Sequence, residues 1–371
     1  NCGIILPSHL LPLNAIGNLA CGLRWMLKKD APFYIRPRLD PSLMSWLGRF
    51  ALHCTPTRRH RSARAVAALL ATAVADFDAI IRAEEIRCEW HRDGAIHLFR
   101  SPGDFQRQAA VDAETRRFGP GCTALDRDTV KDIEPAVGPG VVGAWMDERA
   151  AHLRPDLLMT ELRRILTRRG VSILEHTGWR SFRRENGRAV TAVTSRGEVR
   201  ADAFAVATGA WTPLLSTAIG RRVAIQPGKG YSVTLSGAEG APGHPCFFEE
   251  YRSVATPWQG GLRLGGTMEF AGYDDRIDPV RIAALFSAAK RYLRLRSFGR
   301  IEERWCGWRP MTFDSVPIID RIPGAENVVL AAGHNMLGIS MAPATGRLVA
   351  EMLSGKKPHI VPSPYRLDRF G

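Results

Sequence analysis

The sequence lacks any long hydrophobic run. Its longest uncharged apolar stretch, Ala65 to Ala75, is well short of the roughly 20 residues that cross a bilayer. It also lacks paired cysteines, because its seven cysteines are scattered, odd in number and form no CxxC motif. This pattern predicts neither a zinc site nor a disulfide framework, so we expect no metal and a reducing cytoplasm.

Acidic residues are outnumbered, and lysine is scarce. The chain has 51 Lys plus Arg against 37 Asp plus Glu, a formal net charge of +14, and almost all the basic residues are Arg. Such a charge can indicate nucleic-acid or membrane binding. However, the basic residues are spread from Arg24 to Arg369, and the densest run is only Arg58-Arg59-His60-Arg61. We interpret them as a solvated surface and expect no nucleic-acid partner, with weak attraction to anionic lipid or RNA as the alternative.

The length and composition indicate a globular protein of two domains. The chain has 371 residues, of which 45% are hydrophobic and 24% charged, which excludes a disordered or collagenous chain. Strand and helix patterns alternate towards both ends, and an antiparallel β pattern fills residues 223–272. The sequence therefore predicts an α/β protein with a β-rich second domain.

Hydrophobic periodicity places the main elements. Helices are predicted at Leu19–Lys28, Ser62–Glu85, Asp104–Phe118, Asp156–Arg169, Asp278–Arg291 and Ile339–Leu353. A hairpin is predicted at Cys88–Phe99 about the Asp93-Gly94 turn, and a strand at Val171–Glu175. The apolar run Ala203–Ala207 predicts a strand buried on both faces.

Three strand-and-turn segments are candidate cofactor sites. One match to a dinucleotide fingerprint, Gly138-Pro-Gly140-Val-Val-Gly143, has no strand before it and no clear helix after it, so we interpret it as a loop. In contrast, Val328–Pro343 predicts a buried strand, a Gly turn and a helix start that can hold an anion. Thr208-Gly209-Ala210-Trp211 follows a second buried strand, where the backbone could approach a flat cofactor.

A fourth segment, Cys306-Gly-Trp-Arg-Pro-Met-Thr312, places a lone arginine among apolar and aromatic residues. Arg309 there is a candidate bidentate clamp for a carboxylate, with a structural ion pair as the alternative.

Together, the segments ADAFAVATGAW, PGKGYSVTL, LRLGGTMEF, CGWRPMTFDSVPIID and LAAGHNMLGISMAPATGRLVAEMLSG resemble the D-amino-acid oxidase superfamily of FAD-dependent oxidoreductases. The closest resemblance is to its bacterial D-amino-acid dehydrogenase branch, and it covers essentially the whole chain. Two departures concern one segment, where Ser315 and Asp320 stand at positions at which the family usually has Gly. The second of them predicts a different loop after Ile319.

The resemblance implies the roles of site residues. Arg309 matches the arginine that pairs with the substrate carboxylate, and Tyr251 matches a position in the β block that roofs the substrate. The turn beside the flavin ring is matched by Gly209 and Trp211, and the other flavin contacts by Gly333, His334, Asn335, Met336, Leu337, Gly338, Ile339 and Ser340. We interpret His334 as a residue that stabilises the turn rather than as a base.

The resemblance also implies a discontinuous FAD-binding domain (1–12, 61–98, 145–222 and 306–371) and a substrate-binding domain (13–60, 99–144 and 223–305). The expected fold is a Rossmann-like FAD domain and an antiparallel-sheet substrate domain. The family's first βαβ unit, with its GxGxxG turn, is expected to precede Asn1-Cys2-Gly3 and to be missing here.

The implied activity is FAD-dependent oxidative deamination of D-amino acids, with hydride transfer from Cα to flavin N5. Electrons would pass to a quinone or another respiratory acceptor, and peripheral binding of this cytoplasmic protein to the inner face of the cell membrane is a further expectation. The alternatives are a glycine or sarcosine oxidase, a D-hydroxyproline enzyme, a tRNA-modification oxidase module and an inactive fragment.

Overall fold

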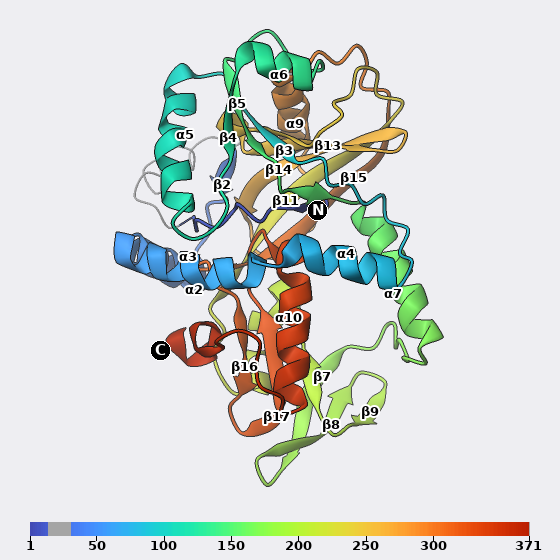
Figure 1. Cartoon of the computed structure of the whole chain (residues 1–371). Coiled ribbons are helices and arrows are strands. Elements are labelled where there is room, and N and C mark those ends of the chain that lie inside the picture. The colour runs from blue at the N-terminus through green and yellow to red at the C-terminus, as the bar shows by residue number, and fades with distance from the viewer. Residues whose placement is uncertain (14–30, 371) are drawn as a thin grey trace.

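The computed structural model describes residues 1–13 and 31–370. Figure 1 shows an upper part built around a large sheet and a lower part around a smaller one, with α3 and α4 running between them. The helices are α2 (Pro41–His53), α3 (Pro56–Leu70), α4 (Ala73–Ala83), α5 (Pro102–Thr115), α6 (Arg127–Ile133), α7 (Pro155–Arg168), α8 (Ser216–Ile219), α9 (Pro279–Tyr292) and α10 (Gly338–Leu353). Short 3-10 helices include η1 (Gly209–Leu215) and η2 (Glu249–Tyr251).

The strands belong to four sheets. They are β1 (Ile4–Ile5), β2 (Phe33–Ile35), β3 (Ala95–Phe99), β4 (Thr123–Asp126), β5 (Gly143–Asp147), β6 (Ala151–His152), β7 (Trp179–Glu185), β8 (Arg188–Thr194), β9 (Gly197–Arg200), β10 (Phe204–Val206), β11 (Ile225–Ser236), β12 (Cys246–Phe248), β13 (Ser253–Trp258), β14 (Gly261–Phe270), β15 (Arg300–Thr312), β16 (Ile318–Ile322) and β17 (Ala325–Ala332).

The large sheet runs in the order β15-β11-β14-β13-β12-β3-β5-β4, and β2 pairs with β14. Helix α9 covers one face, where Tyr231 and Cys306 share a core with Leu285. Because side chains alternate along a strand, Gly230 and Arg309 lie in the rows that point to the opposite face. The first residues of the chain cover part of that face, since Ile4 and Leu6 pack with Val254 of β13.

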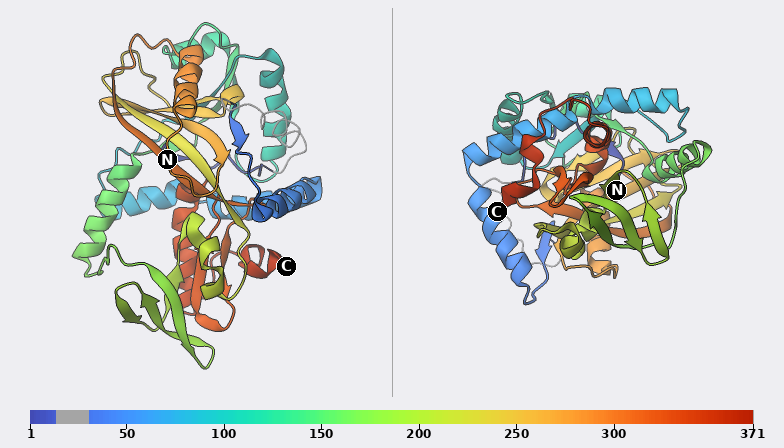
Figure 2. Two further views of the ribbon diagram at one scale, coloured as in Figure 1. Left: turned by 180° about the vertical axis from the view of Figure 1, so that it is seen from behind. Right: turned by 90° about the horizontal axis from the view of Figure 1, so that it is seen from below.

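The smaller sheet has the order β10-β17-β16, with β10 parallel to β17 and β16 antiparallel to it. Helix α10 follows β17 and packs Met341 and Leu348 against Val329. The carboxyl ends of parallel strands share one edge of a sheet, which is where ligands of α/β proteins bind. The turns that follow β10 and β17 therefore lie at the same edge. The view from behind also shows the N-terminus near the junction of the upper and lower parts (Figure 2, left).

The predicted α/β class with an antiparallel β-rich part is confirmed. Four of the predicted helices are present with bounds shifted by a few residues at most, as α5, α7, α9 and α10. Asp278 caps α9 by accepting a hydrogen bond from the Val280 N–H at 2.9 Å. The segment Gly138–Gly143 is a loop up to the start of β5, as expected. The predicted helix Leu19–Lys28 lies outside the described residues, and the domain boundaries stay a prediction.

The single helix predicted at Ser62–Glu85 is wrong, because the chain forms two helices there. Helix α3 begins earlier, at Pro56, and α4 restarts at Ala73. Thr72 has a φ of −113° and a ψ of 7°, outside the helical region, and its hydroxyl donates to the Asp76 carboxylate of α4 at 2.6 Å.

The hairpin predicted at Cys88–Phe99 is also wrong. Gly94 has a φ of +82° and turns the chain as expected, but His91 pairs with His152 instead of with β3. Strand β3 instead lies between β12 and β5, which buries Ile96 and Leu98 completely. Non-local pairing that buries both side chains outweighs the local turn signal.

Three further predictions were wrong, and two of them concern strands of the smaller sheet. Residues 171–175 form no strand, and Val171, Ile173 and Leu174 are exposed. Within β10 only Val206 is buried and Ala205 is exposed, because β17 is its sole strand neighbour among the described residues. The loop expected after Ile319 is part of β16, where the Asp320 carboxylate accepts a hydrogen bond from the Leu367 N–H at 2.8 Å.

Candidate active site

The turn after β17 is fixed by its backbone conformation and by hydrogen bonds. Gly333 has a φ of +80°, and a Cβ there would meet Thr312 Cγ2 at 2.6 Å, so only glycine fits. Asn335 also has a left-handed φ, of +51°. Its Nδ2 donates to the Gly333 carbonyl at 2.9 Å, and its Oδ1 accepts from the Thr312 N–H at 3.0 Å. The turn is therefore fixed to the end of β15.

Helix α10 begins directly after this turn. The first amides of a helix have no acceptor in the preceding turn, and no acceptor is found among the described residues for those of Gly338, Ile339 and Ser340. The Ser340 hydroxyl accepts from the Leu6 N–H at 3.3 Å, which joins the helix start to the N-terminal segment. The helix dipole adds partial positive charge at these amides, so this end favours an anionic group.

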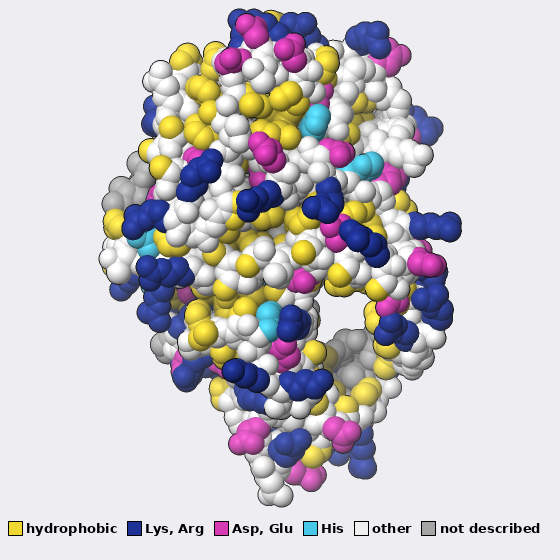
Figure 3. All heavy atoms as spheres, in the orientation of Figure 1, with side chains coloured by type: hydrophobic (Ala, Val, Ile, Leu, Met, Phe, Trp, Pro, Cys, Tyr) yellow, Lys and Arg dark blue, Asp and Glu magenta, His cyan; other side chains and the backbone are white. Residues whose placement is uncertain are grey.

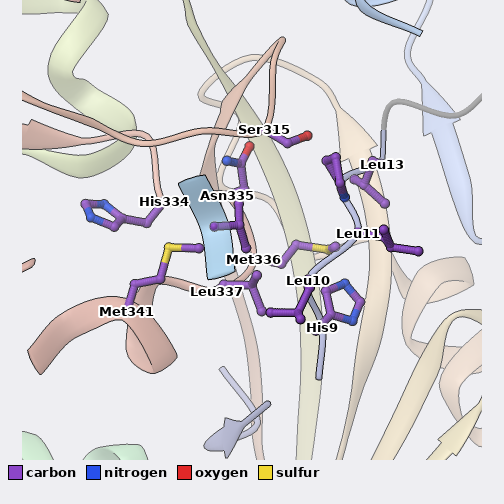
Figure 4. A pocket seen from close by; sticks show the side chains of 12 residues that line it. His9, Leu10, Leu11, Leu13, Ser315, His334, Asn335, Met336, Leu337 and Met341 are labelled. Carbon is purple, nitrogen blue, oxygen red and sulfur yellow. The ribbon is translucent and has the colours of Figure 1, made fainter. Parts of the chain in front are cut away.

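A largely apolar pocket lies against the turn (Figure 4). It is lined by His9, Leu10, Leu11, Pro12, Leu13, Val66, Ser315, His334, Asn335, Met336, Leu337 and Met341. The N-terminal segment and the turn of β17 thus form facing walls of one cavity. Ser315 has a φ of +63°, in the region that favours glycine.

His334 belongs to the turn, and its ring contacts helix α10. Its Nε2 lies 3.0 Å from the Thr345 hydroxyl of α10. Burial lowers the pKa of His334 to about 4, so its ring is neutral at physiological pH. Its contacts support the interpretation of His334 as a residue that stabilises the turn.

Arg309 lies on the face of the large sheet opposite α9. Its Nη1 donates to the Thr267 carbonyl of β14 at 2.9 Å. Burial lowers the pKa of this guanidinium, and no carboxylate of the described residues lies within ion-pair distance of it. A charged group so placed has donors left for an anion, as the carboxylate-clamp hypothesis requires.

The second turn, after β10, reaches the same strand as Arg309. Gly209 has a φ of +54° and opens η1. The ring of Trp211 meets that of Trp308 edge to face, with centroids 5.7 Å apart, and Trp211 is 53% exposed. Tyr273 donates its hydroxyl to the Ala210 carbonyl at 2.7 Å. The backbone on either side of Arg309 therefore connects to both turns, although the ring of Trp308 points to the opposite face of the strand from Arg309.

The structure does not bring Tyr251 into this group. Its ring packs edge to face on Tyr292, with centroids 6.1 Å apart, and lies beneath Arg291 of α9. These contacts are on the α9 side of the sheet, whereas Arg309 points to the opposite side. The role of Tyr251 as a substrate ligand stays a prediction.

Sequence reasoning missed several residues at the site. Thr267 and Thr312 act through backbone groups, which leave no signature in the residue type. His9 lines the pocket from the N-terminal segment, and no pattern around it indicated this. Gly230 could have been found, because it lies in the PGKGYSVTL segment that carries the family resemblance.

No group of three or more His, Cys, Asp or Glu residues in the described part of the chain could hold a metal ion. No helix described is long and apolar enough to cross a membrane. On the face shown in Figure 3, Lys and Arg side chains are scattered among acidic and uncharged ones.

Two glycine turns at the ends of parallel strands, a helix start with free amides and an apolar pocket wall are features that suit a flat cofactor with an anionic edge in an α/β protein. Comparison with known proteins identifies the family. Residues 36–352 match the model of the DAO family of FAD dependent oxidoreductases, and the chain belongs to this family. The apolar pocket wall and the free amides of α10 fit the ring of that cofactor.

Curated relatives and solved structures agree with this assignment. The D-amino acid dehydrogenase of Granulibacter bethesdensis is 33% identical over 100% of this chain and 90% of the relative. That of Bradyrhizobium diazoefficiens is 29% identical over 100% of this chain and 89% of the relative. Glycine oxidase from Bacillus cereus has the same fold, with a TM-score of 0.72 at 21% identity, covering 79% of this chain and 82% of that structure.

Proposed function

We propose that this protein oxidises D-amino acids to 2-oxo acids and ammonia, using FAD. The observation that carries the proposal is the position of Arg309, a partly buried guanidinium with no carboxylate partner among the described residues, on the strand that contacts the turns after β10 and β17. The curated relatives named D-amino acid dehydrogenase support the substrate class.

The residues of this chain would divide the work as follows. Arg309 binds the α-carboxylate of the substrate and thereby orients its Cα. FAD, when bound, supplies the acceptor for the hydride that leaves Cα. The free amides of Gly338, Ile339 and Ser340 stabilise negative charge at the cofactor edge that faces them. Loss of the hydride from Cα and a proton from nitrogen gives an imino acid, which water hydrolyses to the 2-oxo acid and ammonia.

We further propose that the electrons pass to a quinone or another respiratory acceptor rather than to oxygen, with the protein bound peripherally to a membrane surface. The net charge of +14 supports attraction to anionic lipid.

The test is a substrate survey of purified, FAD-loaded protein. We expect it to reduce a quinone analogue or redox dye with D-alanine and other D-amino acids, to leave the L-enantiomers unchanged and to form little hydrogen peroxide. Rapid peroxide formation with glycine or sarcosine would assign it instead to the amine oxidases of the same family. Absence of turnover with all D-amino acids would refute the proposal.

A further inference from the structure

Gly230 lies directly beneath the guanidinium of Arg309. The two residues are on adjacent antiparallel strands, where Gly230 pairs with Gly307 and Arg309 pairs with Gly228. The Arg309 side chain crosses β11 at Gly230 and reaches the Thr267 carbonyl on β14. A Cβ at position 230 would overlap Nη1, Nη2 and Cζ of Arg309. The guanidinium therefore lies against the bare Cα of Gly230.

Glycine is needed here for space and not for backbone freedom. Gly230 does not have a left-handed φ, and its pairing with β15 is regular, whereas the pairing of β11 with β14 is interrupted by a bulge between Lys229 and Tyr231. A glycine inside a strand costs stability, because it packs no side chain and loses more backbone entropy on folding. Its placement is explained by the close approach of Arg309.

We propose that Gly230 is a positioning residue that sets where Arg309 presents its donors to the substrate carboxylate. This inference rests on the proposed role of Arg309. A side chain at position 230 lifts the guanidinium off β11 and breaks its bond to Thr267. The atoms displaced are the far end of a flexible side chain, so the arginine can move while the fold persists. The effect of the substitution therefore falls on carboxylate binding and not on folding.

Gly228 provides a matched control on the same strand and the same face. A Cβ there would meet Met268 Sδ at 2.5 Å and Met311 Cγ at 2.8 Å, which are also parts of flexible side chains. Both substitutions add one methyl group to β11, and both demand that a neighbouring side chain move. Only a Cβ at position 230 overlaps the guanidinium directly, whereas position 228 reaches it through Met268, whose Sδ lies 3.9 Å from Arg309 Nη1.

The experiment compares the wild type, Gly230→Ala and Gly228→Ala with FAD bound. Pyruvate, a simple 2-oxo acid, is the probe, and its binding is measured by calorimetry. A misplacement of about 1 Å in a positioned group can cost about 100-fold. We expect Gly230→Ala to weaken pyruvate binding and to raise KM for D-alanine by about 10- to 100-fold. We expect kcat to change much less, and Gly228→Ala to bind pyruvate within about threefold of the wild type.

Equal pyruvate binding by Gly230→Ala and the wild type overturns the inference, as does equal weakening in the two variants. If Gly230→Ala fails to fold, the double variant Gly230→Ala with Arg309→Ala tests whether the guanidinium causes the failure. Recovery of folding locates the overlap at the guanidinium, and continued failure overturns the inference. Wild-type protein that binds pyruvate but oxidises no D-amino acid refutes the proposed function only, and the comparison of pyruvate binding still decides Gly230. Wild-type protein that does neither refutes both.

Discussion

Asn335 and Thr312 hold the turn of β17 against the strand that carries Arg309. Asn335 Oδ1 accepts a hydrogen bond from the Thr312 N–H at 3.0 Å, and its Nδ2 donates to the Thr312 hydroxyl at 3.2 Å. The backbone N–H of Asn335 also donates to the Pro310 carbonyl at 3.1 Å. Three hydrogen bonds of Asn335 therefore fix the distance between the turn after β17 and the end of β15, the strand that carries Arg309.

Replacing Asn335 separates its two contributions to stability. Asn335→Gly keeps the left-handed φ but leaves the Thr312 N–H without its acceptor, at a cost of about 1–3 kcal/mol. Asn335→Ala should cost about 1 kcal/mol more, because alanine is strained at positive φ. In urea denaturation, the free energy of unfolding should decrease from the wild type to Asn335→Gly and again to Asn335→Ala. An alanine variant as stable as the glycine variant would contradict this explanation.

Removing the guanidinium of Arg309 should impair substrate binding. We expect Arg309→Ala to raise KM for D-amino acids by at least about 30-fold, since breaking a buried charged pair costs about 2 kcal/mol or more. Arg309→Lys keeps the charge but loses the bidentate geometry, so its KM should be intermediate. Steady-state kinetics at fixed acceptor concentration measure both. An unchanged KM in the alanine variant would refute the clamp assignment.

His334 should behave as a structural residue. Because its ring is neutral and bonded to Thr345, His334→Gln should leave the pH profile of kcat unchanged. Loss of a catalytic base would instead lower kcat by about 100- to 10,000-fold. Thr345→Val provides the matched variant. Each single change should cost about 1 kcal/mol of stability, and the double variant should cost less than their sum, because both remove the same hydrogen bond.

Buried His152 should make the protein sensitive to acid. Its side chain is 3% exposed and stacks on His91 at 4.9 Å, and burial together with the nearby His91 lowers its pKa to about 4. In the unfolded chain the pKa of histidine is about 6.5, so the unfolded state binds more protons between these values. The stability that the neutral His152 contributes is complete above about pH 6.5 and is lost as the pH falls towards 4. At pH 5 this loss is about 2 kcal/mol.

The measurement is the free energy of unfolding at pH 7 and pH 5. His152→Phe keeps an aromatic ring against His91 but cannot titrate, so its loss of stability between the two pH values should be smaller than that of the wild type. His9 and His334, whose pKa values burial also lowers to about 4, should account for part of the remaining loss. Identical losses in the variant and the wild type would show that His152 does not titrate in this range.

Local sequence signals predicted the elements whose side chains and turns specify them directly. Helix α9 has its Asp278 cap and Pro279 at the first turn, and α10 follows a glycine turn, so both were placed well. The glycine turns after β10 and β17 were also predicted, since left-handed backbone leaves a signature in the residue type. The failures were elements whose form depends on distant partners. Strand β3 left its local hairpin to pair with β12 and β5, and residues 171–175 formed no strand because none of the described strands lies beside them.

The sequence by itself determined the α/β class, the candidate cofactor turns and Arg309 as the candidate carboxylate ligand. Its similarity to a known family also predicted FAD as the cofactor, which the match to the DAO family confirms. Only the tertiary structure decided that Arg309 has no carboxylate partner among the described residues, that Tyr251 lies on the other face of its sheet and that Gly230 lies beneath the guanidinium. The alternation of side chains across nine paired strands decides these relationships, and strand register is a property of the folded sheet.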